Sequence, residues 1–291
     1  MRRAILSSLA QTRFHEVLVV DDGSSDGTSE LVRDEFPEVR LIRSDQSLGY
    51  VIQRNLGAQL AIGDILFSID DDAEFSSPNI TAATLNEFDD PRIGAVAIPY
   101  VEPLKADKEF QRTPSTDRTY VIDRFIGTAH ALRRDVFLSL GGYRQELVHQ
   151  GEESDYCLRL LDAGYVVRLG NADPIVHYES PLRDWSRVDY YGSRNTILFV
   201  YQNVPMPFLP VHLAAATWNV GAWTFAPSRF ANRIKAVAHA YRWCFQNSAE
   251  RKPVSISAYR LFRRLRKAGP MQLEEAGQRL RSLDGFGSGR D

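Results

Sequence analysis

Residues 16–28 read EVLVVDDGSSDGT, an apolar run that leads into an acidic turn. The run predicts a β-strand over 16–20, because apolar residues dominate it and turn formers follow it. Ligands of open α/β sheets bind at the carboxyl ends of the strands, so Asp21 and Asp22 are candidates to accept hydrogen bonds from a nucleobase or a ribose. Asp, Gly and Ser also form tight turns, and this segment alone is equally compatible with a structural role.

The same alternation of apolar runs and helical patterns continues to about residue 180, which predicts an α/β fold with a mostly parallel sheet and helices on both faces. Residues 125–143 predict a strand and a helix that stops at Gly141-Gly142. Residues 102–118 are polar, contain two prolines and predict a mobile loop. Ser77-Pro78 predicts the beginning of a helix. Further strands are expected at 39–43, 64–69 (buried), 93–101, 166–170 and 174–178, and helices at 29–36, 48–62, 77–88 and 151–165.

Helical patterns dominate after Asp184, with breaks at 203–210, 226–228 and 251–255. We expect three parts: an α/β catalytic domain over 1–200, a helical extension over 201–284 and a flexible tail over 285–291. The most apolar stretch, 204–226, contains three prolines, a histidine and an asparagine. A membrane-spanning helix needs about 20 predominantly apolar residues, so this stretch is not expected to span.

The formal net charge of the 291 residues is −2, which gives no reason to expect nucleic acid as a partner. The charge is unevenly placed, however. Residues 228–291 carry 14 Lys+Arg and 5 Asp+Glu, a net of +9, which leaves 21 and 32, a net of −11, for residues 1–227. The two cysteines, Cys157 and Cys244, do not suggest a disulfide framework, and a reducing compartment fits them. The N-terminus lacks the apolar run of a signal peptide.

A second acidic cluster follows the strand expected at 64–69, in the sequence SIDDDAEF (68–75). Side chains alternate in an extended chain, so Asp70 and Asp72 are expected on one side and Asp71 on the other. Three adjacent carboxylates repel one another, and a divalent cation would remove that repulsion. Oxygen ligands suit Mg²⁺ or Mn²⁺, which commonly also hold substrate phosphates. The alternative is a solvated acidic turn.

A third cluster, GEESDYCLRL (151–160), places Glu152 and Glu153 in the first turn of a helix. The helix dipole favours ionised carboxylates there, which keeps one available as a general base. First-turn acids are also common without any function. Asp155 and Arg159 are four residues apart, which predicts a pair on the helix surface.

Two single residues add weaker candidates. His177 ends the strand expected at 174–178, where it is either a metal ligand or a structural histidine. Arg54 lies inside the helix expected at 48–62, where it either reaches a nucleotide or is simply solvated.

In their order along the chain, these clusters resemble family 2 of the inverting glycosyltransferases, which have the GT-A fold, a Rossmann-like architecture. The resemblance covers about residues 1–200. VVDDGSSDGT (19–28) is similar to the nucleoside-binding turn of the family. SLGYVIQRNLGAQLAIGD (47–64) resembles its Gly-ArgAsn-Gly helix, and SIDDDAEF its Asp-x-Asp motif. GTAHALRRDVFLSLGGY (127–143) resembles the unit near the acceptor, and GEESDYCLRLLDAGY (151–165) the motif that supplies the base.

The resemblance implies a role for each of these residues. Asp21, Asp22 and Arg54 would bind the nucleoside, and Asp70 and Asp71 the rest of the nucleotide-sugar. Asp70 and Asp72 would hold Mg²⁺ or Mn²⁺, with His177 as a further ligand. Glu153 would be the base and Glu152 its reserve, although many relatives have Asp at the position of Glu153.

The N-terminus departs from the family pattern, because SSLAQT (7–12) matches the end of the family's first helix and the strand before that helix is missing. We expect a truncated start, with strands 16–20 and 64–69 on either side of the missing strand. In the folded chain, these two either stand two strand spacings apart, which we favour, or have closed up and paired directly. The first alternative leaves backbone groups without partners, so this chain would be aggregation-prone and inactive by itself.

These inferences predict an enzyme that transfers a sugar from a nucleoside-diphosphate sugar to an acceptor hydroxyl with inversion. The acceptor would be a glycan or a lipid-linked sugar of cell-surface polysaccharide synthesis. We expect the enzyme in the cytoplasm, with peripheral contact at the inner face of the membrane. Two alternatives stay open: a catalytically inactive nucleotide-sugar-binding relative, and a sugar-phosphate nucleotidyltransferase. A dinucleotide-binding domain is disfavoured, since no strand is followed by Gly-x-Gly-x-x-Gly.

Overall fold

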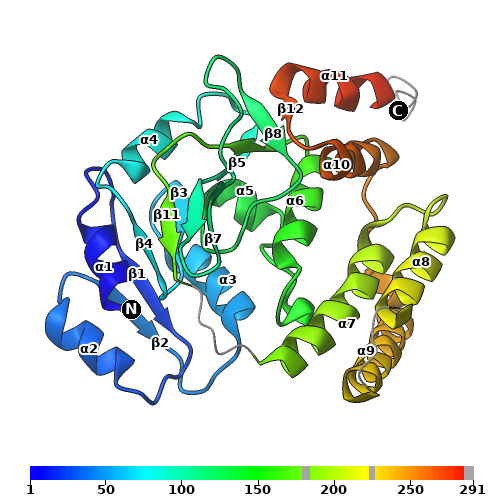
Figure 1. The fold of residues 1–291 in the computed structure, drawn as a ribbon, viewed down its shortest axis with the longest axis horizontal. Helices are drawn as coiled ribbons and strands as arrows, with labels where there is room; N and C mark the ends of the chain where they lie inside the picture. Colours follow the sequence, from blue (N-terminus) through cyan, green and yellow to red (C-terminus); the bar gives the residue numbers. More distant parts are fainter. Residues whose placement is uncertain (179–183, 223–226, 285–291) are drawn as a thin grey trace.

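Three β-sheets organise the chain in the computed structural model, which describes residues 1–178, 184–222 and 227–284 (Figure 1). The tail expected at 285–291 lies outside the described residues. Helices pack around the sheets, so the α/β fold class is confirmed. They are α1 (Arg2–Leu9), α2 (Thr28–Glu35), α3 (Tyr50–Leu60), α4 (Ile80–Asn86), α5 (Arg134–Ser139), α6 (Glu152–Asp162), α7 (Trp185–Asn203), α8 (Leu209–Ala222), α9 (Pro227–Gln246), α10 (Ile256–Ala268) and α11 (Leu273–Asp284).

The largest sheet has six strands in the order β12-β8-β10-β5-β9-β3. Only β10 and β5 are parallel neighbours; every other pair in this sheet is antiparallel. The expectation of a mostly parallel sheet is therefore wrong, because β8 and β9 run antiparallel to the other four strands and leave only β10 and β5 as parallel neighbours. The strands are β3 (Ile65–Ser68), β5 (Ile93–Ala97), β8 (Tyr120–Ile122), β9 (His130–Arg133), β10 (Val166–Leu169) and β12 (Met271–Gln272).

The two smaller sheets hold the other strands. β1 (Leu18–Asp21) and β2 (Arg40–Arg43) form a parallel pair. The third sheet has the order β4-β11-β6-β7, in which β11 is antiparallel to β4 and parallel to β6. Its strands are β4 (Ala73–Phe75), β6 (Tyr100–Glu102), β7 (Ala106–Phe110) and β11 (Ile175–His177).

Two local expectations are wrong. The helix expected from Ser77 begins only at Ile80, because the Ser77 hydroxyl bonds to Asp173 instead of capping the helix. The polar segment 102–118 is no simple loop, since β7 forms a hairpin with β6 inside it. β7 was not apparent from the sequence because its residues, ADKEF, are mostly polar.

β1 and β3, the strands expected to flank a missing one, are not hydrogen-bonded to each other. Among the described residues, β1 pairs with β2 alone and β3 with β9 alone. Direct pairing of the two is therefore wrong for this chain. All four residues of β3 are partly exposed, rather than buried as expected, because the strand lies at the edge of its sheet.

The hydrophobic core extends across the boundary expected near residue 200. One apolar cluster joins Ile93 of β5 and Leu158 of α6 with Phe262 of α10 and Ala276 of α11. β12 also adds an edge strand to the main sheet. Residues 256–284 therefore belong to the same core as β5 and α6, whereas α8 and α9 pack mainly on α7.

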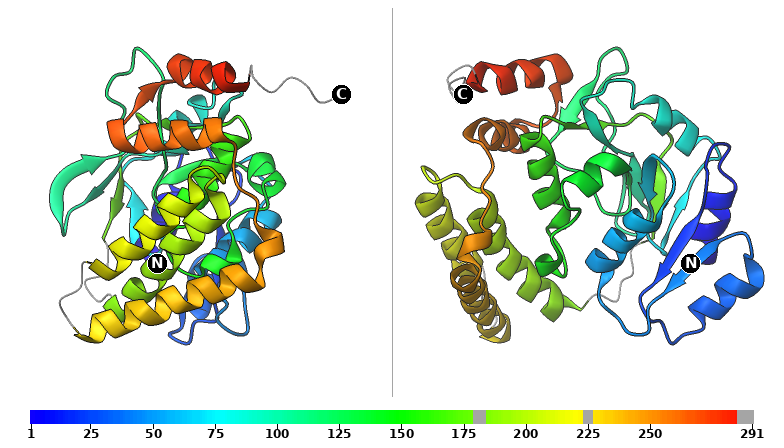
Figure 2. Two further views of the ribbon diagram at one scale, coloured as in Figure 1. Left: turned by 90° about the vertical axis from the view of Figure 1, so that its right-hand side faces the viewer. Right: turned by 180° about the vertical axis from the view of Figure 1, so that it is seen from behind.

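α7, α8 and α9 form a helical layer beside the sheets, and α7 contacts both of the other two helices. Figure 2 shows α8 and α9 together at the edge of the molecule. Among the described residues, no helix combines the length and the apolar composition that crossing a membrane requires.

Candidate active site

Asp70 and Asp72 lie in the turn between β3 and β4, at the carboxyl end of β3. The backbone N–H of Asp70 donates to the Thr128 hydroxyl at 3.1 Å, which ties this turn to the segment before β9. Asp71 is exposed, and its carbonyl accepts a hydrogen bond from the Met1 amine. Asp70 and Asp72 lie close enough together to share a ligand, and Asp71 is not part of this group.

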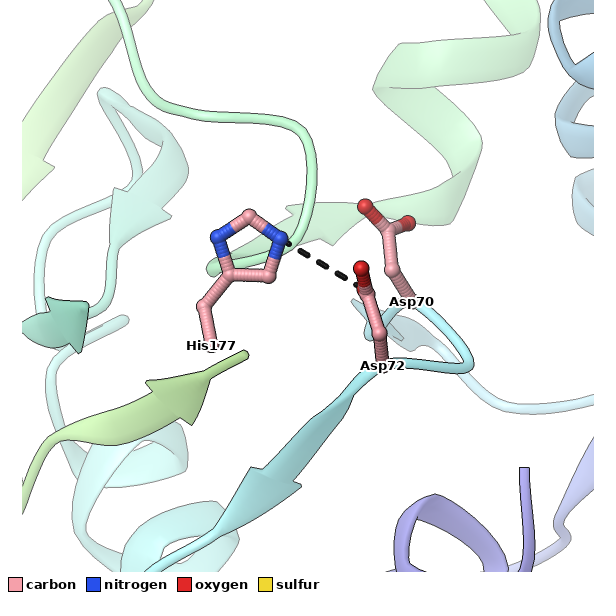
Figure 3. A group of neighbouring side chains, drawn as sticks. All are labelled: Asp70, Asp72 and His177. Atoms are coloured by element: carbon pink, nitrogen blue, oxygen red, sulfur yellow. Dashed lines mark ion pairs between the residues drawn. The ribbon is translucent and has the colours of Figure 1, made fainter. Parts of the chain in front are cut away.

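His177 joins the two aspartates because of the register of the third sheet. The antiparallel pairing of β11 with β4 places His177 opposite Ala73, directly after Asp72. The His177 Nε2 atom lies 3.5 Å from an oxygen of Asp72, as Figure 3 shows. One ligand atom from each of Asp70, Asp72 and His177 lies within 4.8 Å of the others. This spacing suits a single metal ion.

Glu102 orients the His177 ring from the other side. β6 is parallel to β11, so the end of β6 brings Glu102 to 3.1 Å from His177 Nδ1. The hydrogen bond with Asp72 is the main cause that raises the pKa of His177, and Glu102 adds to it. A carboxylate that accepts from Nδ1 fixes the ring so that Nε2 faces the aspartates.

Arg54 connects the aspartates to the glutamates. From α3 its guanidinium donates to Asp70 at 2.6 Å and lies 3.5 Å from Glu152. A side chain at Gly127 would come within 2.8 Å of Arg54 and 2.9 Å of a Glu153 oxygen, so this glycine leaves room for both groups. Arg54 was expected at a nucleotide, and the structure places it at the centre of the acidic site.

Glu152 and Glu153 begin α6, but burial dominates over the helix dipole that was expected to keep them ionised. Burial, and then the charge of Glu153, raises the pKa of Glu152 to about 7. Burial also raises the pKa of Glu153, while Arg54 opposes this shift. The two residues differ in access, since Glu152 is fully buried and Glu153 is partly exposed. Glu153 is therefore the more accessible of the two glutamates.

The loop before these glutamates is held in an uncommon conformation. Val148 (φ 59°) and Gln150 (φ 69°) have positive φ without being glycine, and Gly151 follows at 90°. The buried Asn195 amide of α7 donates to the carbonyls of Leu147, His149 and Gln150 at 2.7–2.8 Å. Such a conformation persists only when its surroundings fix it. Asn195 was not predicted, because nothing in the helical pattern of 185–203 distinguishes it.

Asp21 and Asp22 lie at the end of β1, where protein groups already use their carboxylates. Asp21 is buried and accepts from the backbone of Ser24 at 2.8 Å and from the hydroxyl of Ser29. Asp22 accepts from the backbone N–H groups of Leu48 and Gly49, at 2.7 and 2.9 Å, and so ties β1 to the start of α3. Asp21 therefore fixes the turn between β1 and α2, and Asp22 fixes the loop before α3.

Asp155 does pair with Arg159, at 2.9 Å, but not on the surface of the protein. It is fully buried and also accepts from Arg144 and Asn203, both at 2.7 Å. Three donors around one buried carboxylate indicate a structural role that joins α6 to α7.

The chain is similar to known glycosyltransferases. The family model of glycosyl transferase family 2 matches residues 1–142. A pre-mycofactocin glycosyltransferase from Mycobacterium tuberculosis is 27% identical over 213 residues, which cover 65% of this chain and 43% of the relative. The O-antigen biosynthesis protein RfbC from Myxococcus xanthus is 26% identical over 210 residues, which cover 63% of this chain and 16% of that protein. The matched region spans less than half the length of these curated relatives.

Solved structures share the fold across nearly the whole chain. S. aureus TarS 1–349 in complex with UDP-GlcNAc has a TM-score of 0.61 and 13% identity, and the match covers 99% of this chain and 89% of that one. The mannosyltransferase PcManGT from Pyrobaculum calidifontis, in complex with GDP-Man and Mn²⁺, has a TM-score of 0.54 and 18% identity, with 99% and 84% covered. The first 142 residues thus resemble glycosyl transferase family 2, and the chain shares the GT-A fold of these solved glycosyltransferases.

Proposed function

We propose that this chain transfers a sugar from a nucleoside-diphosphate sugar to an acceptor hydroxyl, with inversion at the anomeric carbon. One observation carries the proposal: Arg54 lies between Asp70, with its neighbours Asp72 and His177, and the glutamates at the start of α6. The candidate metal ligands and the candidate base therefore lie on either side of the Arg54 guanidinium, which supports a single displacement at this site.

The residues present fit a divalent cation. Asp70 and Asp72 offer hard oxygen ligands, and His177 offers a nitrogen that Glu102 orients. Mg²⁺ and Mn²⁺ both suit this donor set, and imidazole favours a transition metal. When bound, the cation would neutralise charge on the diphosphate leaving group. PcManGT, which shares the fold, was solved with Mn²⁺.

Glu153 is proposed as the general base. Its partial exposure lets it meet an acceptor. Burial raises its pKa toward neutral pH, where a general base is most effective. The acceptor hydroxyl gives its proton to Glu153 while its oxygen forms a bond to the anomeric carbon. On the opposite face of the sugar, the bond from that carbon to the diphosphate breaks, and the nucleoside diphosphate leaves with the electron pair. Glu152 is the reserve candidate.

The donor is proposed to bind along the carboxyl ends of β1 and β3. The turn that Asp21 and Asp22 shape would face the nucleoside, with Arg54, Asp70 and Asp71 toward the diphosphate. TarS was solved with UDP-GlcNAc and PcManGT with GDP-Man, so uridine and guanosine donors are the first to screen.

The acceptor is proposed to be a glycan or a lipid-linked sugar of cell-surface polysaccharide synthesis, used on the cytoplasmic side of the membrane. The relative RfbC, an O-antigen biosynthesis protein, supports this class. The resemblance of the acidic and Asp-x-Asp motifs to inverting enzymes supports inversion.

The test is a donor screen followed by assays of the Asp72→Asn variant. We expect one nucleotide-sugar to raise the melting temperature when Mn²⁺ or Mg²⁺ is present, and chelator to abolish transfer. Asp72→Asn should abolish transfer as well, while Asp34→Asn, at an exposed position of α2, should leave it unchanged. Undiminished transfer in excess chelator would refute the metal role. Donor binding without turnover for any acceptor class would instead indicate an inactive binding protein.

A further inference from the structure

A stretch of sixty residues, 190–249, contains no Asp or Glu and five Lys or Arg. The stretch covers most of α7 together with α8 and α9. Acidic residues are abundant in the rest of the chain, which carries all 37 of them. The helical layer therefore differs in charge from the α/β body, and the active site uses none of α8 or α9.

α8 and α9 form the outer part of this layer. Both contact α7, and the apolar side chains that face α7 include Leu213, Val237 and Ala240. Figure 1 places α8 and α9 at the edge of the molecule, with α7 between α8 and the sheets. Apart from the contact between α8 and α9 and the hydrogen bonds of His212 to α10, the sides of the two helices that do not face α7 are available to a partner.

α8 is apolar on its exposed side as well as on its packed side. Val211, Ala214, Ala215 and Trp218 recur every third or fourth residue, so they share one face of the helix. Val211 is 72% exposed and Trp218 is 75% exposed. A surface helix of a soluble protein normally carries polar residues on this face.

α9 has a second exposed apolar stripe, made of Phe230, Ile234, Ala238, Tyr241 and Phe245. Phe245 is 86% exposed, more than any other large apolar side chain among the described residues. The Tyr241 hydroxyl bonds with the Thr217 hydroxyl of α8 at 2.6 Å, so the two stripes adjoin. We call the nine stripe residues of α8 and α9 the hairpin face.

Cations flank the hairpin face. Lys235 and Arg242 are two turns apart on α9, both exposed, and form no ion pair within the described part of the chain. Arg229 and Arg233 differ, since both pair with Asp189 of α7, at 2.5 and 3.2 Å. The surface next to the aromatic stripe therefore presents positive charge that the protein does not neutralise with a nearby acid.

We propose that the hairpin face docks on an anionic phospholipid bilayer. Exposed Trp, Tyr and Phe side chains favour the boundary between headgroups and acyl chains, and the flanking Lys and Arg favour anionic headgroups. α8 has 14 residues, a length of about 21 Å, and is shorter than the hydrocarbon core of about 30 Å. The helices would accordingly lie along the surface of the bilayer.

A second copy of the chain is a poorer occupant for this face. In a two-fold dimer the same surface meets itself, so Lys235 and Arg242 would approach their own copies with no acid from 190–249 to oppose them. An anionic bilayer satisfies the apolar and the basic parts of the face together. The acidic body, net −11 over residues 1–227, would face away from such a surface.

The test is co-sedimentation of the full chain with vesicles of phosphatidylcholine, alone or with about one quarter phosphatidylglycerol. We expect binding to the anionic vesicles at low ionic strength and weaker binding at high ionic strength. Trp218→Ser/Phe245→Ser and Lys235→Glu/Arg242→Glu should each lower partitioning roughly ten-fold or more. All four positions are exposed, so circular dichroism should show an unchanged fold.

Matched controls separate the hairpin face from general effects. Ile62→Ser removes an exposed apolar side chain at the end of α3, and Arg13→Glu/Arg33→Glu reverses two exposed charges elsewhere. Neither should change partitioning. Equal binding to neutral and anionic vesicles, or equal loss in the controls, would overturn the proposal. A dimer in solution that Trp218→Ser/Phe245→Ser dissociates would overturn it too, and would assign the face to a second copy.

Discussion

Glu153 and Glu152 are neighbours in sequence but differ in what they can touch. Because only Glu153 has solvent access, Glu153→Gln should lower kcat by a factor on the order of 10²–10⁴, the usual contribution of a general base. Donor affinity, measured by calorimetry, should change little. Glu152→Gln is the matched control and should lose far less activity. A larger loss of kcat in Glu152→Gln than in Glu153→Gln would instead make Glu152 the general base.

Glu152 should also make stability depend on pH. Its pKa in the folded chain is about 7, above the ordinary value of 4.5, because burial disfavours the charged form. Between these values the unfolded chain ionises while the folded chain stays protonated, so the wild type loses stability as pH rises from about 4.5 to about 7. The Glu152→Gln variant lacks this loss. The difference in the free energy of unfolding between this variant and the wild type, measured with urea, should therefore grow over that window and then level off. An advantage that does not vary with pH would contradict the assignment.

Asn195 is predicted to position the glutamates without touching substrate. Asn195→Ala would release three carbonyls of the strained loop before α6, and a displacement of about 1 Å can cost on the order of 10² in rate. We expect kcat to fall while KM for the donor stays within a few-fold. Asn247→Ala removes an amide that bonds to a single carbonyl at the end of α9 and serves as the control. A fall in stability with unchanged kcat would reduce Asn195 to a structural residue.

The sequence was informative about residues whose chemistry is local. Asp70 and Asp72 follow a recognisable strand, and Glu152 and Glu153 begin a recognisable helix, so their clustering could be anticipated. Glu102 could not, because its contact with His177 depends on which strands pair in the third sheet. Asn195 could not either, since its partners lie about 45 residues earlier in the chain.

At the scale of elements, the close packing of α6 on β5 depends on Gly94. A methyl group there would lie 2.7 Å from a Leu160 methyl and 3.0 Å from Tyr165, closer than atoms tolerate. Gly94→Ala should therefore lower the free energy of unfolding by about 1–3 kcal/mol, as overpacking does. Gly63→Ala, where the nearest atom is 3.6 Å away, should be near neutral. Equal stability of the two variants in chemical denaturation would contradict this packing.

The errors at this scale have a common physical origin. Helix periodicity and apolar runs located most of the helices and the main strands, since both signals are local. Strand direction is not local, so the interleaving of β8 and β9 was missed. β7 is mostly polar, and β12 has two residues, so neither gave a hydrophobic signal.

At the scale of the whole molecule, the expected division at residue 200 separated segments that share a core. Apolar residues of α10 and α11 alternate with many basic ones, which made this region look like an appendage. Burial in one cluster with β5 and α6 makes residues 256–284 part of the α/β unit. The overall fold class could nevertheless be predicted, because it follows from the order of elements rather than from their pairing.

The separate pair of β1 and β2 has a consequence for motion and ligand affinity. The small cluster of Ile5, Val32, Phe36 and Val39 supports this pair apart from the main core. Regions with few buried contacts open at lower free energy than the global unfolding, so amide hydrogens of 18–21 and 40–43 should exchange with deuterium faster than those of 93–97. Mass spectrometry of peptic fragments would measure this, and uniform exchange across the two sheets would contradict it.

A donor that contacts the turn at Asp21 and Asp22 binds only while β1 and β2 are paired and folded. Its apparent Kd is then the intrinsic Kd divided by the closed fraction, and saturation with donor should slow exchange at 18–21 more than at 93–97. Any change that keeps the pair closed, including a neighbouring strand supplied by another chain, would tighten donor binding without adding a single contact to the sugar.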